Sequence, residues 1–137
     1  MKKLFMFIIL ILAVLCLSSC SKNPMSIERV ERITGYDLPN DMKELYHFKD
    51  DTFVGCAGQY SVYSLDTEPM CFSDIKTSSL ISDVDIENMM YYFETYNIPE
   101  EYHPDFEQKY TYITGIENTI IMYFPAEKQL KIWMLGH

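Results

Sequence analysis

Residues 108–134 read QKYTYITGIENTIIMYFPAEKQLKIWM, and this segment predicts three consecutive β-strands. Aromatic and β-branched residues recur along it, and these residue types favour the pleated, half-buried surface of a sheet. The expected strands are residues 108–114, 119–124 and 129–134. The connections between them have four residues each, a length that suits β-hairpins. The segment is therefore expected to fold as an antiparallel meander.

Side chains of the last expected strand of the meander alternate between the two faces of the sheet. Leu130, Ile132 and Met134 fall on one side, opposite Lys131 and Trp133. An antiparallel sheet commonly packs one face on the core and leaves the other solvated. The pattern therefore predicts one apolar face that a helix can cover.

Residues 83–97 predict the helix that covers this face. Ser82 or Asp83 can cap its start, and three acidic residues in its first turns suit the positive end of the helix dipole. Four apolar side chains recur at helical spacing and form a core-facing stripe; they are Ile86, Met89, Met90 and Phe93. The motif Asn97-Ile98-Pro99 closes the helix. The acids do not form a calcium loop, because the glycine and the terminal glutamate of that motif are missing.

The chain before this helix contributes three further elements. Ser26 can cap a short helix that Gly35 ends. Strands are expected at 43–49 and, with a bend, at 52–65, and residues 70–81 form a connector. The element order is therefore α-β-β-α-β-β-β. It predicts one α+β domain over 26–137: an antiparallel sheet of about five strands with helices packed on one face.

The first twenty residues, MKKLFMFIILILAVLCLSSC, have the form of an export signal. Two lysines precede an apolar run at 4–17, which suits a signal-peptide core and is short for a membrane-spanning helix. The run ends in Leu17-Ser18-Ser19-Cys20, which resembles the lipobox of bacterial lipoproteins.

The resemblance implies a signal peptide at 1–19, a lipidated Cys20 and a tether at 20–25. It also implies a protein held by acyl chains on Cys20 at the bacterial cell membrane, facing outside the cytoplasm. Two or more acyl chains give stable anchoring, whereas one gives only marginal binding. An ordinary secretory signal with a chance cysteine, or an uncleaved N-terminal anchor, are the alternatives.

The charge of the chain limits its partners. The 137 residues carry 11 Lys and Arg against 20 Asp and Glu, a net charge of −9. Loss of Lys2 and Lys3 with the signal leaves 9 basic side chains and a net charge of about −11. Such a domain is not expected to bind nucleic acid or to lie flat on anionic lipid. The scattered acids form either a solvated face or a docking surface for a basic protein partner or a cation.

Two cysteines besides the anchor remain in the mature chain. Cys56 and Cys71 can form a disulfide outside the cytoplasm. The alternative is a pair of free thiols packed as small apolar side chains. The chain has no Cys-x-x-Cys motif, and no histidine lies near either cysteine in sequence.

The sequence shows no catalytic signature such as a nucleophile elbow or His-Glu-x-x-His. His103, with Glu101 and Asp105, offers weak metal coordination at best, and a solvated loop is the plainer interpretation. No metal or cofactor is expected. The main hypothesis is a lipid-anchored binding or interaction module of unknown ligand, of the inhibitor or immunity-like kind. The alternatives are a small extracytoplasmic enzyme with a loop site near His103 or Cys56, and a structural envelope component.

Overall fold

The computed structural model describes residues 27–50, 58–73, 81–115 and 118–134. In these ranges, five strands form one antiparallel sheet in the order β1-β2-β5-β4-β3. The elements in chain order are α2 (Ile27–Thr34), β1 (Lys43–Lys49), β2 (Gln59–Ser64), α3 (Met70–Ser73), α4 (Asp83–Thr95), the 3-10 helix η1 (Glu100–Tyr102), β3 (Thr111–Gly115), β4 (Thr119–Phe124) and β5 (Gln129–Met134). The expected α+β class, five-stranded sheet and closing meander are confirmed.

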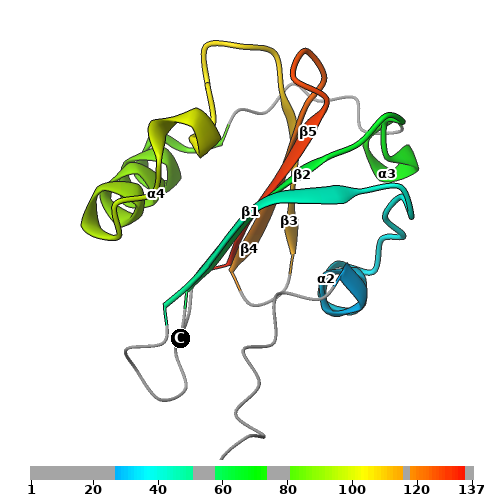
Figure 1. The fold of residues 1–137 in the computed structure, drawn as a ribbon, viewed down its shortest axis with the longest axis horizontal. Helices are drawn as coiled ribbons and strands as arrows, with labels where there is room; N and C mark the ends of the chain where they lie inside the picture. The colour runs from blue at the N-terminus through cyan, green and yellow to red at the C-terminus, as the bar shows by residue number, and fades with distance from the viewer. Residues whose placement is uncertain (1–26, 51–57, 74–80, 116–117, 135–137) are drawn as a thin grey trace, which may run out of the picture.

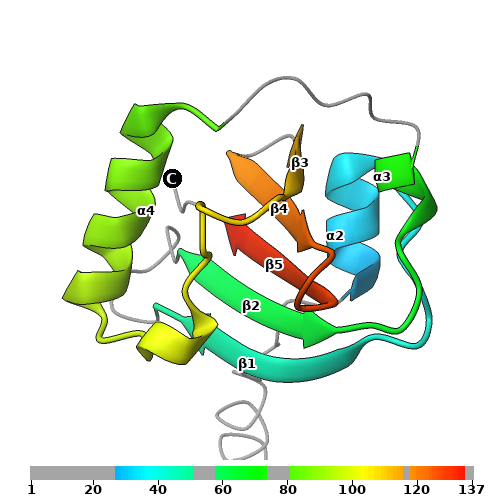
Figure 2. The same cartoon turned by 90° about the horizontal axis from the view of Figure 1, so that it is seen from above.

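The helices cover both faces of the sheet, and the expectation that they share one face is wrong. Figures 1 and 2 show α4 on one side of the sheet and α2 with α3 on the other. Two separate apolar clusters fill the two interfaces. The reason is that β4 and nearly all of β5 are buried on both faces, so neither face can remain in water.

The helix α4 packs on the face of β5 that carries Trp133, not on the face of Leu130. Met89 and Phe93 from α4 belong to the same buried cluster as Trp133. The opposite face, with Leu130, packs against α2 and α3. Lys131 lies on the same face as Trp133. It does not make this face solvent-exposed, because Lys131 is itself only 1 % exposed.

The edge strand β1 is interrupted by a bulge between Glu44 and Tyr46. Leu45 stands at the bulge and is exposed. Tyr46 and Phe48 pack on the α4 face, and His47 contacts a serine of β2, with 2.7 Å between His47 Nδ1 and the hydroxyl oxygen. A bulge at an edge strand hinders pairing with another sheet.

The helix ends follow the sequence signals closely. The Ser82 hydroxyl accepts a hydrogen bond from the Asp85 amide at 3.1 Å, so Ser82 is the cap of α4. Gly35 ends α2 with a φ of +73°, and Asn97 follows α4 with a φ of +52°. Both values lie in the left-handed region that commonly closes a helix.

Some boundaries differ from the expected ones, for local reasons. The helix α4 ends at Thr95 rather than at 97. The strand β3 starts at Thr111 rather than at 108, because the Gln108 amide donates to the Asp105 carbonyl and forms a turn. The connector expected at 70–81 contains the short helix α3. The first part of the strand expected at 52–65 lies outside the described residues.

Candidate functional site

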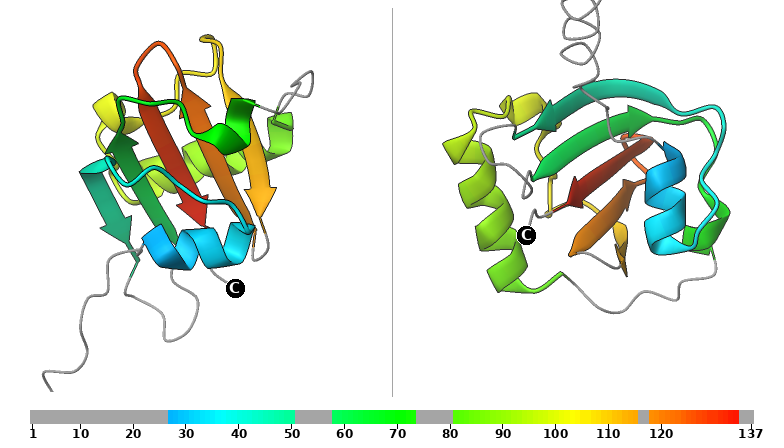
Figure 3. Two further views of the ribbon diagram at one scale, coloured as in Figure 1. Left: turned by 90° about the vertical axis from the view of Figure 1, so that its right-hand side faces the viewer. Right: turned by 90° about the horizontal axis from the view of Figure 1, so that it is seen from below.

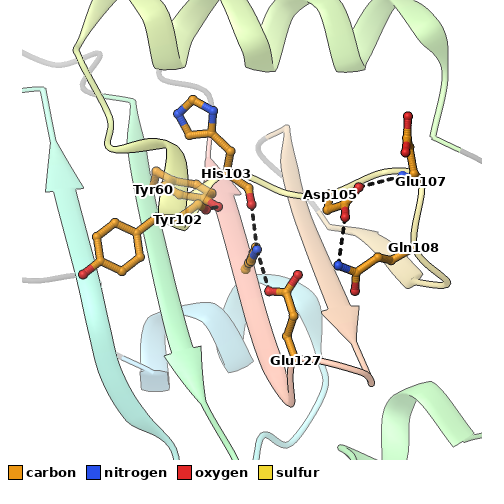
Figure 4. A network of polar contacts seen from close by, with 8 residues as sticks. Tyr60, Tyr102, His103, Asp105, Glu107, Gln108 and Glu127 are labelled. Atoms are coloured by element: carbon orange, nitrogen blue, oxygen red, sulfur yellow. Dashed lines mark hydrogen bonds and ion pairs between the residues drawn. The ribbon is translucent and has the colours of Figure 1, made fainter.

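The loop expected at residues 98–107, which was considered for an enzyme site, is held to the sheet by its polar groups. The Lys131 ammonium donates to the His103 carbonyl at 2.7 Å and pairs with Glu127 at 2.9 Å. Beside it, the Tyr60 hydroxyl donates to the Tyr102 carbonyl at 2.6 Å. Figure 4 shows Tyr60, Tyr102 and His103 on the α4 side of the sheet. The loop is thereby held against the buried face of β2 and β5.

The imidazole of His103 also takes a structural position. Its Nε2 atom lies 2.8 Å from the Ile98 carbonyl oxygen. Its ring lies against Phe93, with 4.8 Å between the ring centroids. The ring therefore connects Ile98, at the start of the loop, to α4, which gives the imidazole a packing role.

The acidic residues of the loop do not converge with His103. Asp105 accepts from the Glu107 amide at 3.0 Å and from the Gln108 side chain at 2.8 Å, which makes a local turn (Figure 4). Over the part of the chain that the structure describes, no three His, Cys, Asp or Glu side chains gather as metal ligands would. The weak metal site considered for His103, Glu101 and Asp105 is thus not assembled here.

The structure describes only one of the two cysteines of the domain. Cys71 is half-buried on α3 and packs against the apolar cluster under α2. Burial raises the pKa of its thiol, which keeps the thiol protonated at neutral pH and slows its reactions. Cys56 lies outside the described residues, so the disulfide between Cys56 and Cys71 stays a prediction. Cys20, with the expected signal and tether, also lies outside them.

A groove on the α2 and α3 side of the sheet is the strongest candidate for a binding site. Its volume is about 630 Å³, within the range of ligand pockets. Two chain segments line it: residues 35–39, which follow α2, and residues 67–71 at the start of α3. Figure 3 (left) shows α2 and α3 on the same face of the sheet.

The packing of α2 and α3 brings the two segments together. The Gly35 amide donates to the Glu31 carbonyl at 2.7 Å, and the Leu38 amide donates to the Glu31 carboxylate at 2.8 Å. Phe72 lies under α3 against Tyr123, with 5.8 Å between their ring centroids. Leu38 and Phe72 belong to one buried cluster, so both segments rest on the same core.

The groove combines an apolar lining with negative charge. Leu38 is only 6 % exposed and lies at its buried side, whereas Met70 is 82 % exposed. Each segment contributes one exposed carboxylate, Asp37 and Glu68, and no Lys or Arg of the described ranges lines the groove. The arrangement suits a ligand that is apolar in part and positively charged.

The sequence did not point to this groove. Its segments are about thirty residues apart, and each reads as an ordinary turn. The exposed methionine after Pro69 was a weak signal, because a single exposed apolar residue is normal on a protein surface. No known family model, curated protein or solved structure matches the chain.

Proposed function

We propose that this protein is a lipid-anchored extracytoplasmic binding module that holds a partner protein in the groove between residues 35–39 and 67–71. The observation that supports this most is the groove itself, with Met70 82 % exposed at its open side and Leu38 beneath. Methionine is a flexible, polarizable side chain that adapts to different partners. Two exposed apolar side chains, Tyr36 and Met70, line the groove, so a partner bound there would remove apolar surface from water.

The enzyme alternative has less support from the described residues. The polar groups that would serve it at His103 are engaged with the backbone of the loop and with α4. The Cys56 site lies outside the described residues. The binding hypothesis therefore rests on an open surface, whereas the enzyme hypothesis at His103 rests on a side chain with a structural role.

The proposed anchor would keep the domain near the lipid. Ile27, where α2 begins, is seven residues from Cys20. Seven extended residues span at most about 25 Å. With about −11 net charge, the mature domain would be repelled by anionic headgroups rather than lie flat on them. Among the described residues, no helix has the length and apolarity to cross a membrane.

Site-specific photo-cross-linking in intact cells tests the proposed binding site. A photoreactive amino acid at position 70 lies at the groove, and one at position 91 is a matched control. Tyr91 is similarly exposed, at 72 %, but belongs to α4 on the other face of the sheet. We expect a discrete adduct of one added mass from position 70 and none from position 91. Adducts from position 91 alone, or from neither position, would contradict the groove as the binding site.

A further inference from the structure

We infer that the occupant of the groove is an extended, basic segment of the partner protein, in which an apolar side chain is flanked by Lys or Arg. This inference rests on the proposed function and adds the chemistry of the partner. It is carried by the charges and the apolar surface of the groove together.

The charge of the groove sets the charge of its occupant. Asp37 and Glu68 come from different segments, and both are exposed. Among the residues that the structure describes, no basic side chain lines the groove to neutralise them. A positively charged segment is drawn toward such a site and gains contacts on arrival, whereas an acidic one is repelled. Because one acid stands in each segment, basic residues on both sides of the occupant's apolar residue can be paired.

The apolar surface requires an apolar side chain between these charges. Leu38 offers the buried contact, and Met70 can close over the occupant from the exposed side. Burial of apolar area is the main favourable term in association. The carboxylates alone would give weak and salt-sensitive binding, because exposed ion pairs contribute little. Affinity is therefore expected to need both features.

The size of the groove favours an extended segment over a helix. A helix is about 10–12 Å across and rises 5.4 Å per turn, so one turn fills roughly 500 Å³. The volume of the groove, about 630 Å³, is close to that of a single helical turn. An extended segment instead spreads its backbone along the groove and places alternate side chains on either side.

The net charge argues against a second copy of this chain as the occupant. Two mature copies would each carry about −11, and like charges at contact oppose association. The expected tether contains Lys22 and Met25, so it has the same two features as the inferred occupant. The experiment below includes that competitor.

The direct test is binding of a synthetic peptide to the full-length lipoprotein in detergent. The probe is a fluorescein-labelled peptide, Gly-Lys-Lys-Leu-Lys-Lys-Gly, followed by anisotropy at 50 and 300 mM NaCl. The double variant Asp37→Asn/Glu68→Gln should weaken binding about fivefold or more at low salt. The matched control Glu87→Gln/Glu94→Gln removes the same charge from α4, on the other face, and should change binding less than twofold.

Each other outcome overturns a stated part of the inference. An equal loss of peptide binding in both double variants would mean that the peptide is attracted by the overall negative charge and not by the groove. Unchanged binding to a peptide with serine in place of leucine would remove the apolar requirement. A tighter complex on Lys22→Ser/Met25→Ser would assign the groove to the protein's own tether. If the groove variant binds the probe normally while position 70 still cross-links, the basic occupant is wrong and the proposed function stands.

Discussion

The ammonium group of Lys131 lies 2.7 Å from the carbonyl oxygen of His103, and this contact joins the buried centre of the sheet to the loop at 98–107. The same ammonium group lies over the ring of Phe124, with the Nζ atom 4.8 Å from the ring centroid. Glu127, in the turn between β4 and β5, supplies the counter-charge, with 2.9 Å between its Oε2 atom and the Lys131 Nζ atom. One side chain on a central strand therefore supports the loop, the hairpin and the core at once.

Truncation of Lys131 should destabilise the fold strongly. We expect Lys131→Ala to lower the free energy of unfolding by about 2–4 kcal/mol, because it leaves a cavity and removes the donor to His103. Lys131→Met keeps most of the stem and should cost about half as much. Urea unfolding of both variants measures this. Wild-type stability for Lys131→Met would show that the ammonium contacts contribute nothing net, as is known for some buried ion pairs.

Gly58 is expected to be needed for the packing of α4 on the sheet. A Cβ atom at Gly58 would stand 2.8 Å from Cε2 of Tyr92. Gly58→Ala should therefore destabilise by about 1–3 kcal/mol through overpacking. Gly35 is the control, because a Cβ atom there meets nothing within 4 Å. Any loss of stability on substitution there comes from the φ of +73°. Gly35→Ala should cost about 1–2 kcal/mol.

A double-mutant cycle separates these two causes. The substitution Tyr92→Leu should remove most of the stability loss that Gly58→Ala causes. It should remove none of the loss that Gly35→Ala causes. Equal, additive penalties in both backgrounds would disprove the steric cause at Gly58. Thermal unfolding of the wild type, the three single variants and the two double variants gives the two coupling energies.

The cap of α4 should contribute about 1 kcal/mol to stability. The Ser82 hydroxyl accepts from the Asp85 amide and donates to the Asp85 carboxylate. Ser82→Ala removes both contacts, whereas Ser82→Asp keeps an acceptor for the amide. We expect a loss of about 1 kcal/mol for the alanine and a smaller one for the aspartate in urea unfolding. Equal losses would indicate that the acceptor at this position is unimportant.

Buried tyrosines should make the fold sensitive to high pH. Burial raises the pKa of Tyr60 and of Tyr92 above the ordinary value of 10.0. Above pH 10 the unfolded chain loses these protons while the folded chain keeps them, so the unfolded state binds fewer protons and stability falls as pH rises. Below pH 10 the contribution is fully present. Urea midpoints between pH 8 and 11.5 should decline above pH 10; a flat or rising profile would contradict the burial.

The meander and the helix ends were predictable because local chemistry determines them. Alternation and four-residue connections gave the bounds of β4 and β5, and Ser82 and Gly35 marked helix ends. The placement of α4 was not predictable in the same way. Lys131 made one face of β5 look solvated, and only the contacts with Glu127 and the His103 carbonyl reveal how that charge is buried.

The groove was beyond prediction from the sequence for a different reason. Leu38 and Met70 belong to segments that are joined only through the shared core under α2 and α3. That core exists because the sheet is covered on both faces, which the sequence pattern did not indicate. A site formed between distant loops depends on the packing of the helices and not on a motif.

In the proposed function, the place where the groove meets its partner depends on Cys20, since the predicted anchor would hold the domain outside the cytoplasm. The deciding measurement is the intact mass of the protein extracted from membranes, with and without reduction before alkylation. We predict a chain that starts at Cys20 and carries the mass of its acyl groups, and the alkylation count will show whether Cys56 and Cys71 are paired. A chain without lipid that starts elsewhere, or an uncut chain from Met1, would contradict the lipid-anchored module.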